Sequence, residues 1–305
     1  MNSPAIDKEP AEKSENFLGL RGNDQEFKKL CRAPKFAWPT FFLFLVTAIT
    51  TAGTIIATVT GALEIPYWGA AMILGLAGYF QFSPAHDAAH RAYSSNQRLN
   101  EFMGNLAMLG AGSPVGITTL RRVHIQHHVY ANGSKDPDHW VHHGSIFTFP
   151  FRWATVELYY VYFYFTTLQP RPAKEVRGVI LGLAAAATII TTLIVMGYGE
   201  EVFWLWFVPG RISVFLISTA FVFLPHFPHE VAQNEAPYRA STIRSGWEWL
   251  LTPLLAFQNY HLIHHLYPTA PFYQMGKIWR LKSKEKEFMD KNPSVVDAFG
   301  FTPKS

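Results

Sequence analysis

Four long apolar stretches stand out in a chain of 305 residues. They cover about residues 37–63, 67–85, 178–198 and 202–224, and a helix needs about 20 apolar residues to cross a bilayer. Short links join the first stretch to the second and the third to the fourth. The pattern therefore predicts an all-α integral membrane protein with four transmembrane helices in two hairpins.

Two further apolar stretches are less regular. Residues 102–118 are interrupted by glycines and a proline, and residues 146–168 are rich in tyrosine but also carry Arg152 and Glu157. Neither has the uninterrupted apolar length of a crossing helix. We expect both to form interfacial helices that cap the bundle on its cytosolic side.

The polar ends of the chain complete the predicted domain organisation. Residues 1–23 are rich in Glu, Lys, Ser and Pro, which predicts a disordered cytosolic N-terminus. Residues 24–290 form the predicted membrane domain, and residues 291–305 a C-terminal tail.

Charge predicts the orientation of the spans. In the link inside each hairpin the only charged residues are glutamates (Glu64, Glu200 and Glu201). Lysine and arginine gather at the opposite ends of the spans. The positive-inside rule then assigns both termini and the loops that carry the basic residues to the cytosol. The N-terminus has the pattern of neither a signal peptide nor a transit peptide, so we expect a multi-pass protein of the bacterial inner membrane.

Composition agrees with a membrane protein. Hydrophobic residues make up 49% of the chain and charged residues 16%, against about 25% charged in an average soluble domain. The net charge of +4 fits the positive-inside rule, and no interleaved basic and aromatic pattern indicates nucleic-acid binding. The single cysteine, Cys31, excludes an intramolecular disulfide and a cysteine-based zinc site.

Histidine carries the candidate chemistry. Eight of the 13 histidines fall into three short groups: His86 and His90; His124, His127 and His128; and His261, His264 and His265. On a helix, positions i, i+3 and i+4 share one face, so each group presents its imidazoles together. Eight imidazoles are too many for one structural zinc ion, which takes four ligands. Haem needs single facing histidines deep in two spans, so two metal ions are the better interpretation.

The three groups, in this order around two apolar hairpins, resemble the membrane fatty acid desaturase and hydroxylase superfamily. The resemblance covers nearly the whole chain from about residue 37. It implies that the eight histidines hold two non-haem iron ions, that O₂ is a co-substrate, and that no catalytic residue is needed beyond the iron ligands. His226 follows the fourth apolar stretch, where the family tends to have an additional ligand.

Other motifs are similar to cyanobacterial-type β-carotene hydroxylases. They include Asp136-Pro-Asp-His139, Leu224-Pro-His226 and the run from Gln258 to Pro268. The likeness implies hydroxylation of β-carotene at the ring 3-position, towards zeaxanthin. The chain departs from the pattern after His226, at Phe227 and over residues 231–238. A fatty acid desaturase that acts on acyl-lipid or acyl-CoA therefore remains the alternative.

Several polar residues near these groups are candidates for orienting the ligands. Asp87, Asp136 and Asp138 could accept hydrogen bonds from imidazole N–H groups, although turn formation around Pro137 also explains the latter two. Asn259 is a candidate either for binding a metal-linked water or for capping the helix of the third group.

The four remaining histidines are weaker candidates. His139 matches the hydroxylases and could also support the ligands, whereas we interpret His142 and His143 as surface residues despite their spacing. His229 is expected in an irregular loop between Pro225 and Glu230.

The electrons for O₂ chemistry must come from another protein. The chain has no Gly-x-Gly-x-x-Gly fingerprint, no His-Pro-Gly-Gly haem motif and no cysteine set for an iron–sulfur cluster. We expect a ferredoxin-like donor, whose acidic surface would suit a basic cytosolic face, and a lipid-soluble carotenoid or acyl substrate. A non-catalytic membrane metal or haem protein is the competing class.

Overall fold

The structure is a computed structural model that describes residues 25–301. The predicted disorder of residues 1–23 lies outside the described part of the chain, as do residues 302–305.

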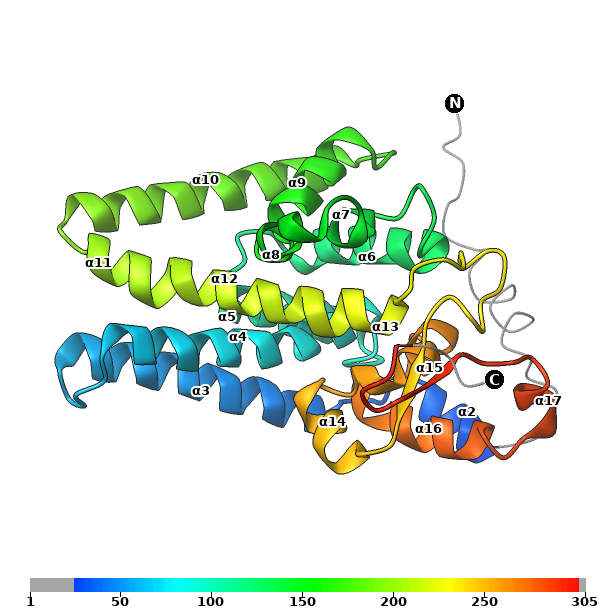
Figure 1. The fold of residues 1–305 in the computed structure, drawn as a ribbon. Coiled ribbons are helices and arrows are strands. Elements are labelled where there is room, and N and C mark those ends of the chain that lie inside the picture. Colours follow the sequence, from blue (N-terminus) through cyan, green and yellow to red (C-terminus); the bar gives the residue numbers. More distant parts are fainter. Residues whose placement is uncertain (1–24, 302–305) are drawn as a thin grey trace.

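The first two apolar stretches form a pair of adjacent helices. Helix α3 (Trp38–Thr60) ends at Gly61, whose positive φ of 68° suits glycine, and α4 (Tyr67–Ala89) returns beside it (Figure 1). The buried residues of α3 are Thr40, Thr47 and Thr54, seven residues apart, while Leu45, Val46, Ile49, Ile56 and Val59 are exposed. A helix that buries its hydroxyls and exposes its aliphatic side chains suits a lipid environment.

The second pair begins with α10 (Ala173–Val195). The chain then returns through one nearly continuous helical run that contains two π-helical turns: α11 (Gly199–Val202), η2 (Phe203–Phe207), α12 (Val208–Ile217), η3 (Ser218–Phe223) and α13 (Leu224–His226). This run lies beside α4 in Figure 1. The turn η3 directly precedes His226, and π-helical turns of this kind are frequent at functional sites.

Among the described residues, three helices are long and apolar enough to cross a membrane: Trp38–Thr60, Ala173–Val195 and Gly199–His226. Only 6% of the most apolar window of α10 is buried, so lipid is the environment that explains its surface. Helix α4 is as long as α3 but is less apolar, because its second half carries Gln81, His86 and Asp87. Three of the four predicted spans are thus supported, and the span that corresponds to α4 stays a prediction.

Helices α4 and α12 approach each other closely. Ser213 on α12 donates a hydrogen bond to the carbonyl of Gly75 at 2.8 Å. A Cβ atom at Gly78 would lie 2.2 Å from the Ser213 hydroxyl oxygen, and one at Gly75 would lie 2.6 Å from Ile212. The two glycines therefore allow a contact that any larger side chain would prevent.

Short helices pack against the half of the bundle in which α4 and α13 finish (Figure 1). They are α5 (Gln97–Gly110), α6 (Ile117–Tyr130), α7 (His139–His142), η1 (Ile146–Thr148), α8 (Phe149–Trp153) and α9 (Val156–Thr166). The glycine-rich stretch of residues 102–118 is divided between α5 and α6. Helix α9 has 11 residues, too few to cross a bilayer.

The chain from residue 243 onwards packs on the same end, together with α2 (Gln25–Cys31). Its elements are β1 (Ile243–Ser245), α14 (Glu248–Leu254), η4 (Gln258–Tyr260), α15 (His261–Leu266), η5 (Phe272–Gln274), α16 (Met275–Lys282), α17 (Lys286–Met289) and β2 (Val295–Asp297).

Strands β1 and β2 are an addition to the predicted all-α fold. They pair in parallel, with Ile243 opposite Val295. The guanidinium of Arg244 donates to the carbonyls of Ala298 at 3.2 Å and Gly300 at 2.6 Å. The sequence predicted a tail over residues 291–305, but these contacts join its described part to the fold.

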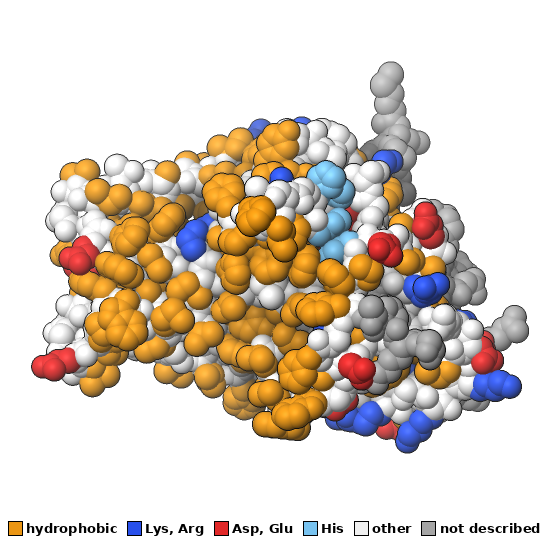
Figure 2. Space-filling model, viewed as in Figure 1, with side chains coloured by type: hydrophobic (Ala, Val, Ile, Leu, Met, Phe, Trp, Pro, Cys, Tyr) orange, Lys and Arg blue, Asp and Glu red, His pale blue; other side chains and the backbone are white. Residues whose placement is uncertain are grey.

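The surface divides along the length of the molecule. Figure 2 shows hydrophobic side chains over most of the long helices, while lysine, arginine and acidic side chains gather mainly at the end that carries the short helices. Exposed Trp38, Trp247 and Trp249 are typical of a membrane–water interface, where amphipathic rings are enriched.

Candidate metal centre

Nine histidines from four helices meet where α4, α6, α13 and α15 come together. His86 lies in the last turn of α4 and His90 follows its end; α6 carries His124, His127 and His128; α13 ends at His226; α15 carries His261, His264 and His265. The structure thus brings together all nine histidines that the sequence nominated as iron ligands. Their role as ligands stays a prediction.

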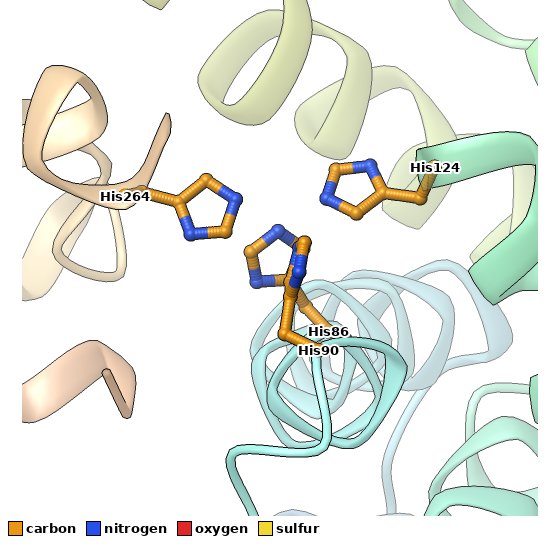
Figure 3. A group of neighbouring side chains, drawn as sticks. All are labelled: His86, His90, His124 and His264. Carbon is orange, nitrogen blue, oxygen red and sulfur yellow. The ribbon is translucent and has the colours of Figure 1, made fainter. Parts of the chain in front are cut away.

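The nine imidazoles form two groups. In the first group, one nitrogen each from His86, His90, His124 and His264 lies within 4.8 Å of the others (Figure 3). His128 adds a fifth, because its Nε2 lies 3.2 Å from Nε2 of His124 and 2.9 Å from Nε2 of His264.

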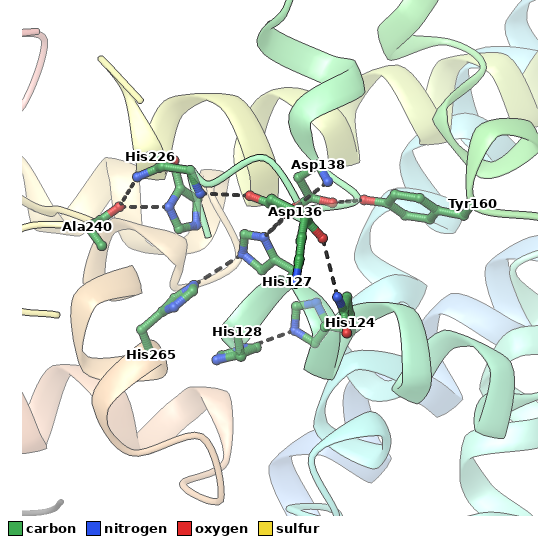
Figure 4. A network of polar contacts seen from close by, with 12 residues as sticks. His124, His127, His128, Asp136, Asp138, Tyr160, His226, Ala240 and His265 are labelled. Atoms are coloured by element: carbon green, nitrogen blue, oxygen red, sulfur yellow. Dashed lines mark hydrogen bonds and ion pairs between the residues drawn. The ribbon is translucent and has the colours of Figure 1, made fainter. Parts of the chain in front are cut away.

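The second group consists of His127, His226, His261 and His265, again with one nitrogen each within 4.8 Å of the others. The Nε2 of His261 lies 3.0 Å from that of His226 and 3.1 Å from that of His265. The Nε2 of His127 lies 3.3 Å from that of His265 (Figure 4).

Helical spacing explains how each motif divides. Histidines four residues apart share a group, as in His124 with His128 and His261 with His265. The histidine three residues after the first, His127 or His264, belongs to the other group. Because neighbours on a helix differ by about 100°, each His-His doublet sends one ring to each group.

Hydrogen bonds assign the ring protons in the second group. The Nδ1 of His226 lies 2.9 Å from the carbonyl oxygen of Ala240, and that of His261 lies 2.5 Å from Oε1 of Gln258. Both oxygens only accept, so both Nδ1 atoms must donate. The Nε2 atoms of neutral His226 and His261 rings therefore carry lone pairs.

Two lone pairs 3.0 Å apart repel each other unless a cation lies between them. Ligands at about 2.1 Å from one ion and about 90° apart are separated by roughly 3.0 Å, which is the separation seen here. The donor chemistry of this group therefore fits a metal ion.

Five rings outside the membrane-crossing helices are also in the protonation state that metals require. Burial, and then repulsion from neighbouring imidazoles, holds the pKa well below its ordinary value for His124, His128, His261, His264 and His265. Neutral imidazole is the ligand form, so burial prepares these residues for coordination.

His127 differs because carboxylates face it. Its Nδ1 lies 2.9 Å from Asp136 and 3.1 Å from Asp138, and all three side chains are buried. Burial alone lowers the pKa of His127, but the two carboxylates outweigh it and raise that pKa. In a metal site the pair keeps a proton on Nδ1 and leaves Nε2 free for the ion. The Tyr160 hydroxyl extends the network by donating to Asp138 (Figure 4).

Asp136 serves both of the purposes considered from sequence. Besides facing His127, it accepts the backbone N–H of Asn132 at 2.8 Å and that of Asp138 at 2.9 Å. The turn around Pro137 and the orientation of His127 thus depend on the same carboxylate.

Two nominated residues make different contacts from those expected. Asp87 accepts the Thr40 hydroxyl at 2.8 Å and the backbone N–H of Phe272 at 3.1 Å, so it ties α3 and η5 to α4 instead of orienting an imidazole. Its position next to His86 turns it about 100° away from that ring. Asn259 does not cap α15, because Tyr260 occupies that position; its amide donates to Thr252 at 3.2 Å.

His139 lies outside both imidazole groups. Its ring stacks on that of His143, with centroids 4.3 Å apart. The expectation that it orients an iron ligand has no counterpart among its described contacts.

Three supporting residues were not assigned a role from the sequence. Gln258 orients His261 from three residues upstream, a spacing that could have been noticed. Tyr160 and Arg121 act across tertiary contacts, and Arg121 donates to the carbonyls of Ala88 and Ala89 at the end of α4. No local pattern points to these two.

Comparison with known proteins agrees with the site. The family model described as fatty acid desaturase matches residues 63–295, which include all nine histidines. An omega-3 fatty acid desaturase of Caenorhabditis elegans, fat-1, is 24% identical over 67% of this chain and 57% of its own length. A beta-carotene ketolase of Paracoccus sp. (strain PC1) is 29% identical over 64% of this chain and 72% of its own.

Proposed function

The chain belongs to the fatty acid desaturase family, and from this premise we propose that it is a membrane-bound di-iron oxygenase that hydroxylates β-carotene at the ring 3-position. The proposal of two metal ions rests on the two imidazole groups, in which Nε2 atoms approach one another at 2.9–3.3 Å. When bound, two iron ions supply the O₂-dependent oxidation of an unactivated C–H bond.

The residues of the chain hold and orient this centre. Four or five imidazoles are available to each ion: His86, His90, His124, His128 and His264 for one, and His127, His226, His261 and His265 for the other. Asp136, Gln258 and the Ala240 carbonyl keep three Nδ1 atoms protonated, so that the Nε2 atoms face the metal. Ring positions fixed in advance lower the cost of arranging the ligands.

The proposal requires that a lipid-soluble substrate reach the site from the membrane. In this proposal α3, α4, α10 and the run α11–α13 cross the bacterial inner membrane, with both termini in the cytosol. The histidines sit at the cytosolic ends of α4 and α13, just beyond the apolar surface. A carotenoid or acyl chain dissolved in the membrane could then present a C–H bond to the metal pair, and its position would decide the product.

The two relatives favour different substrates. The ketolase, which has the higher sequence identity, supports carotenoid ring oxidation, and hydroxylation twice at one ring carbon followed by loss of water yields a ketone. The worm desaturase and the family model support an acyl-lipid or acyl-CoA desaturase as the second candidate. For either, a separate ferredoxin-like protein would deliver the electrons.

Expression in a β-carotene-accumulating bacterium, together with a ferredoxin and its reductase, tests the proposal. Carotenoids and fatty acids are profiled from the same cells, with a His261→Ala chain as the control. Hydroxylated β-carotene that is absent from the control supports the first candidate.

The other outcomes are equally informative. A ring ketone would move the proposal to a ketolase, and a new unsaturated acyl chain with unchanged carotenoids would replace it with the desaturase. No new product in either pool, from a chain that holds two iron ions, overturns both.

A further inference from the structure

The four histidines outside the two imidazole groups also lie together. His139, His142 and His143 belong to α7 and its end, while His229 follows α13 more than 80 residues later. The His142 and His229 rings stack with centroids 4.0 Å apart, and the rings of His139 and His142 are 5.1 Å apart. All 13 histidines of the chain are therefore accounted for by nine central rings and this peripheral cluster of four.

Ring nitrogens of this cluster lack partners. Nδ1 of His139, Nε2 of His142 and both nitrogens of His229 are shielded from solvent without a hydrogen bond among the described residues. An unpaired buried polar atom costs about 1–3 kcal/mol, so four in one cluster indicate a missing ligand.

The backbone and the protonation state are also suited to a ligand. His229 has a φ of 67°, a strained value for a residue with a side chain, which is typical of functional positions. Burial lowers the pKa of His142 to about 4, so this ring is neutral.

The cluster lies at the edge of the central site. The rings of His229 and His226 are 6.5 Å apart, and His143 is exposed. Figure 2 shows histidine side chains on the surface where the apolar area gives way to charged residues. His139, His142 and His229 are half-buried, so the cluster borders the surface.

We propose that His139, His142, His143 and His229 form a peripheral site for one divalent transition-metal ion, such as Zn²⁺, separate from the central pair. Imidazoles with unpartnered nitrogens suit borderline cations of this kind, and the rings must turn before three of their nitrogens converge on one ion. The His142 and His229 rings are now parallel, so binding turns one of them, and exposed His143 can complete the set.

Metal counting tests the site without relying on activity. The chain is purified by a tag that contains no histidine, stripped of metal, dialysed against buffered Zn²⁺ and measured by elemental analysis. A His142→Gln/His229→Gln double variant is compared with the parent. The metal contents of the parent and of the double variant both include any ions in the central site. The difference between the two contents therefore reports the peripheral site alone.

We expect the double variant to bind one equivalent less Zn²⁺ than the parent chain. A Gln126→Ala variant, changed on α6 outside the cluster, should match the parent. Co²⁺ absorption bands lost in the double variant would support imidazole ligation at this site. Equal Zn²⁺ counts in parent and double variant overturn the proposal, as does loss of more than one equivalent, because the central site would then be affected.

Discussion

The Nε2 atoms of His226 and His261 lie 3.0 Å apart, although 35 residues separate the two histidines. Each ring donates its Nδ1 proton to an oxygen on its outer side, Ala240 for one and Gln258 for the other. In the neutral rings, neither Nε2 atom can therefore donate a proton to the other. The short separation is explained if both nitrogens bind one metal ion.

Replacement of His226 by alanine should remove one ion. The second group then keeps three imidazoles, those of His127, His261 and His265. Three ligands hold the metal more weakly than four. Elemental analysis of the purified chain should find about one metal equivalent less than in the parent. A Phe227→Leu chain, changed at the adjacent residue, should keep the parental content. An unchanged metal content in His226→Ala would exclude His226 as a ligand.

Replacement of Gln258 should act through His261. Leucine at this position removes the acceptor for Nδ1 of His261, and loss of such an outer partner weakens metal binding about 10- to 100-fold. Glutamate keeps an acceptor and should largely preserve binding. Metal retention against graded chelator concentrations measures the difference. If the leucine and glutamate chains retained metal alike, the proposed orientation of His261 would be wrong.

Tyr160→Phe should destabilise the chain. It removes the hydroxyl that donates to Asp138 and leaves a buried carboxylate oxygen without that donor. The expected loss is about 1–3 kcal/mol, seen as a lower Tm in detergent. Tyr162, two residues further along α9, is exposed, and its replacement by phenylalanine is the control. Equal Tm values for the two variants would argue against a structural role for the Tyr160–Asp138 contact.

Gly78→Ala should separate α4 from α12. Its new Cβ would overlap Ser213, and overpacking of this kind costs about 1–3 kcal/mol. A methyl group added at Gly53 on α3 would have nothing within 4 Å, so Gly53→Ala should leave the Tm unchanged or raise it. Thermal unfolding of both variants measures the contrast, and a stable Gly78→Ala chain would contradict the close approach.

Cys31 should react slowly in the folded chain. Burial raises the pKa of its thiol to about 12, although nearby Lys282 lowers it slightly. At pH 8 the thiolate is scarce when folded and abundant when unfolded, so alkylation should be about one to three orders of magnitude slower before unfolding. Since the folded pKa is the higher one, this thiol favours folding below about pH 8.5 and less so as the pH rises further.

Mass spectrometry after timed alkylation at pH 8, with and without denaturant, measures both rates. The chain has no other cysteine, so the modified mass reports Cys31 alone. Equal rates in the two conditions would show that this thiol is not protected.

Much of the site could be predicted from local spacing. Apolar length predicted the helices of the bundle, and three of them have the length and composition to cross a membrane. The spacing of His124, His127 and His128 predicted imidazoles on one helical face, because that relationship depends only on rotation per residue. Such rules operate within a single helix and need no knowledge of its neighbours.

The division into two groups required the packing of helices far apart in the chain. His128 meets His264 across 136 residues, and His127 meets His265 across 138. The same holds for Asp87, which faces Thr40 and Phe272 instead of a histidine, and for the contact of Tyr160 with Asp138. Residue spacing describes which way a side chain leaves its own helix, whereas its partner depends on how separate helices approach and bury one another.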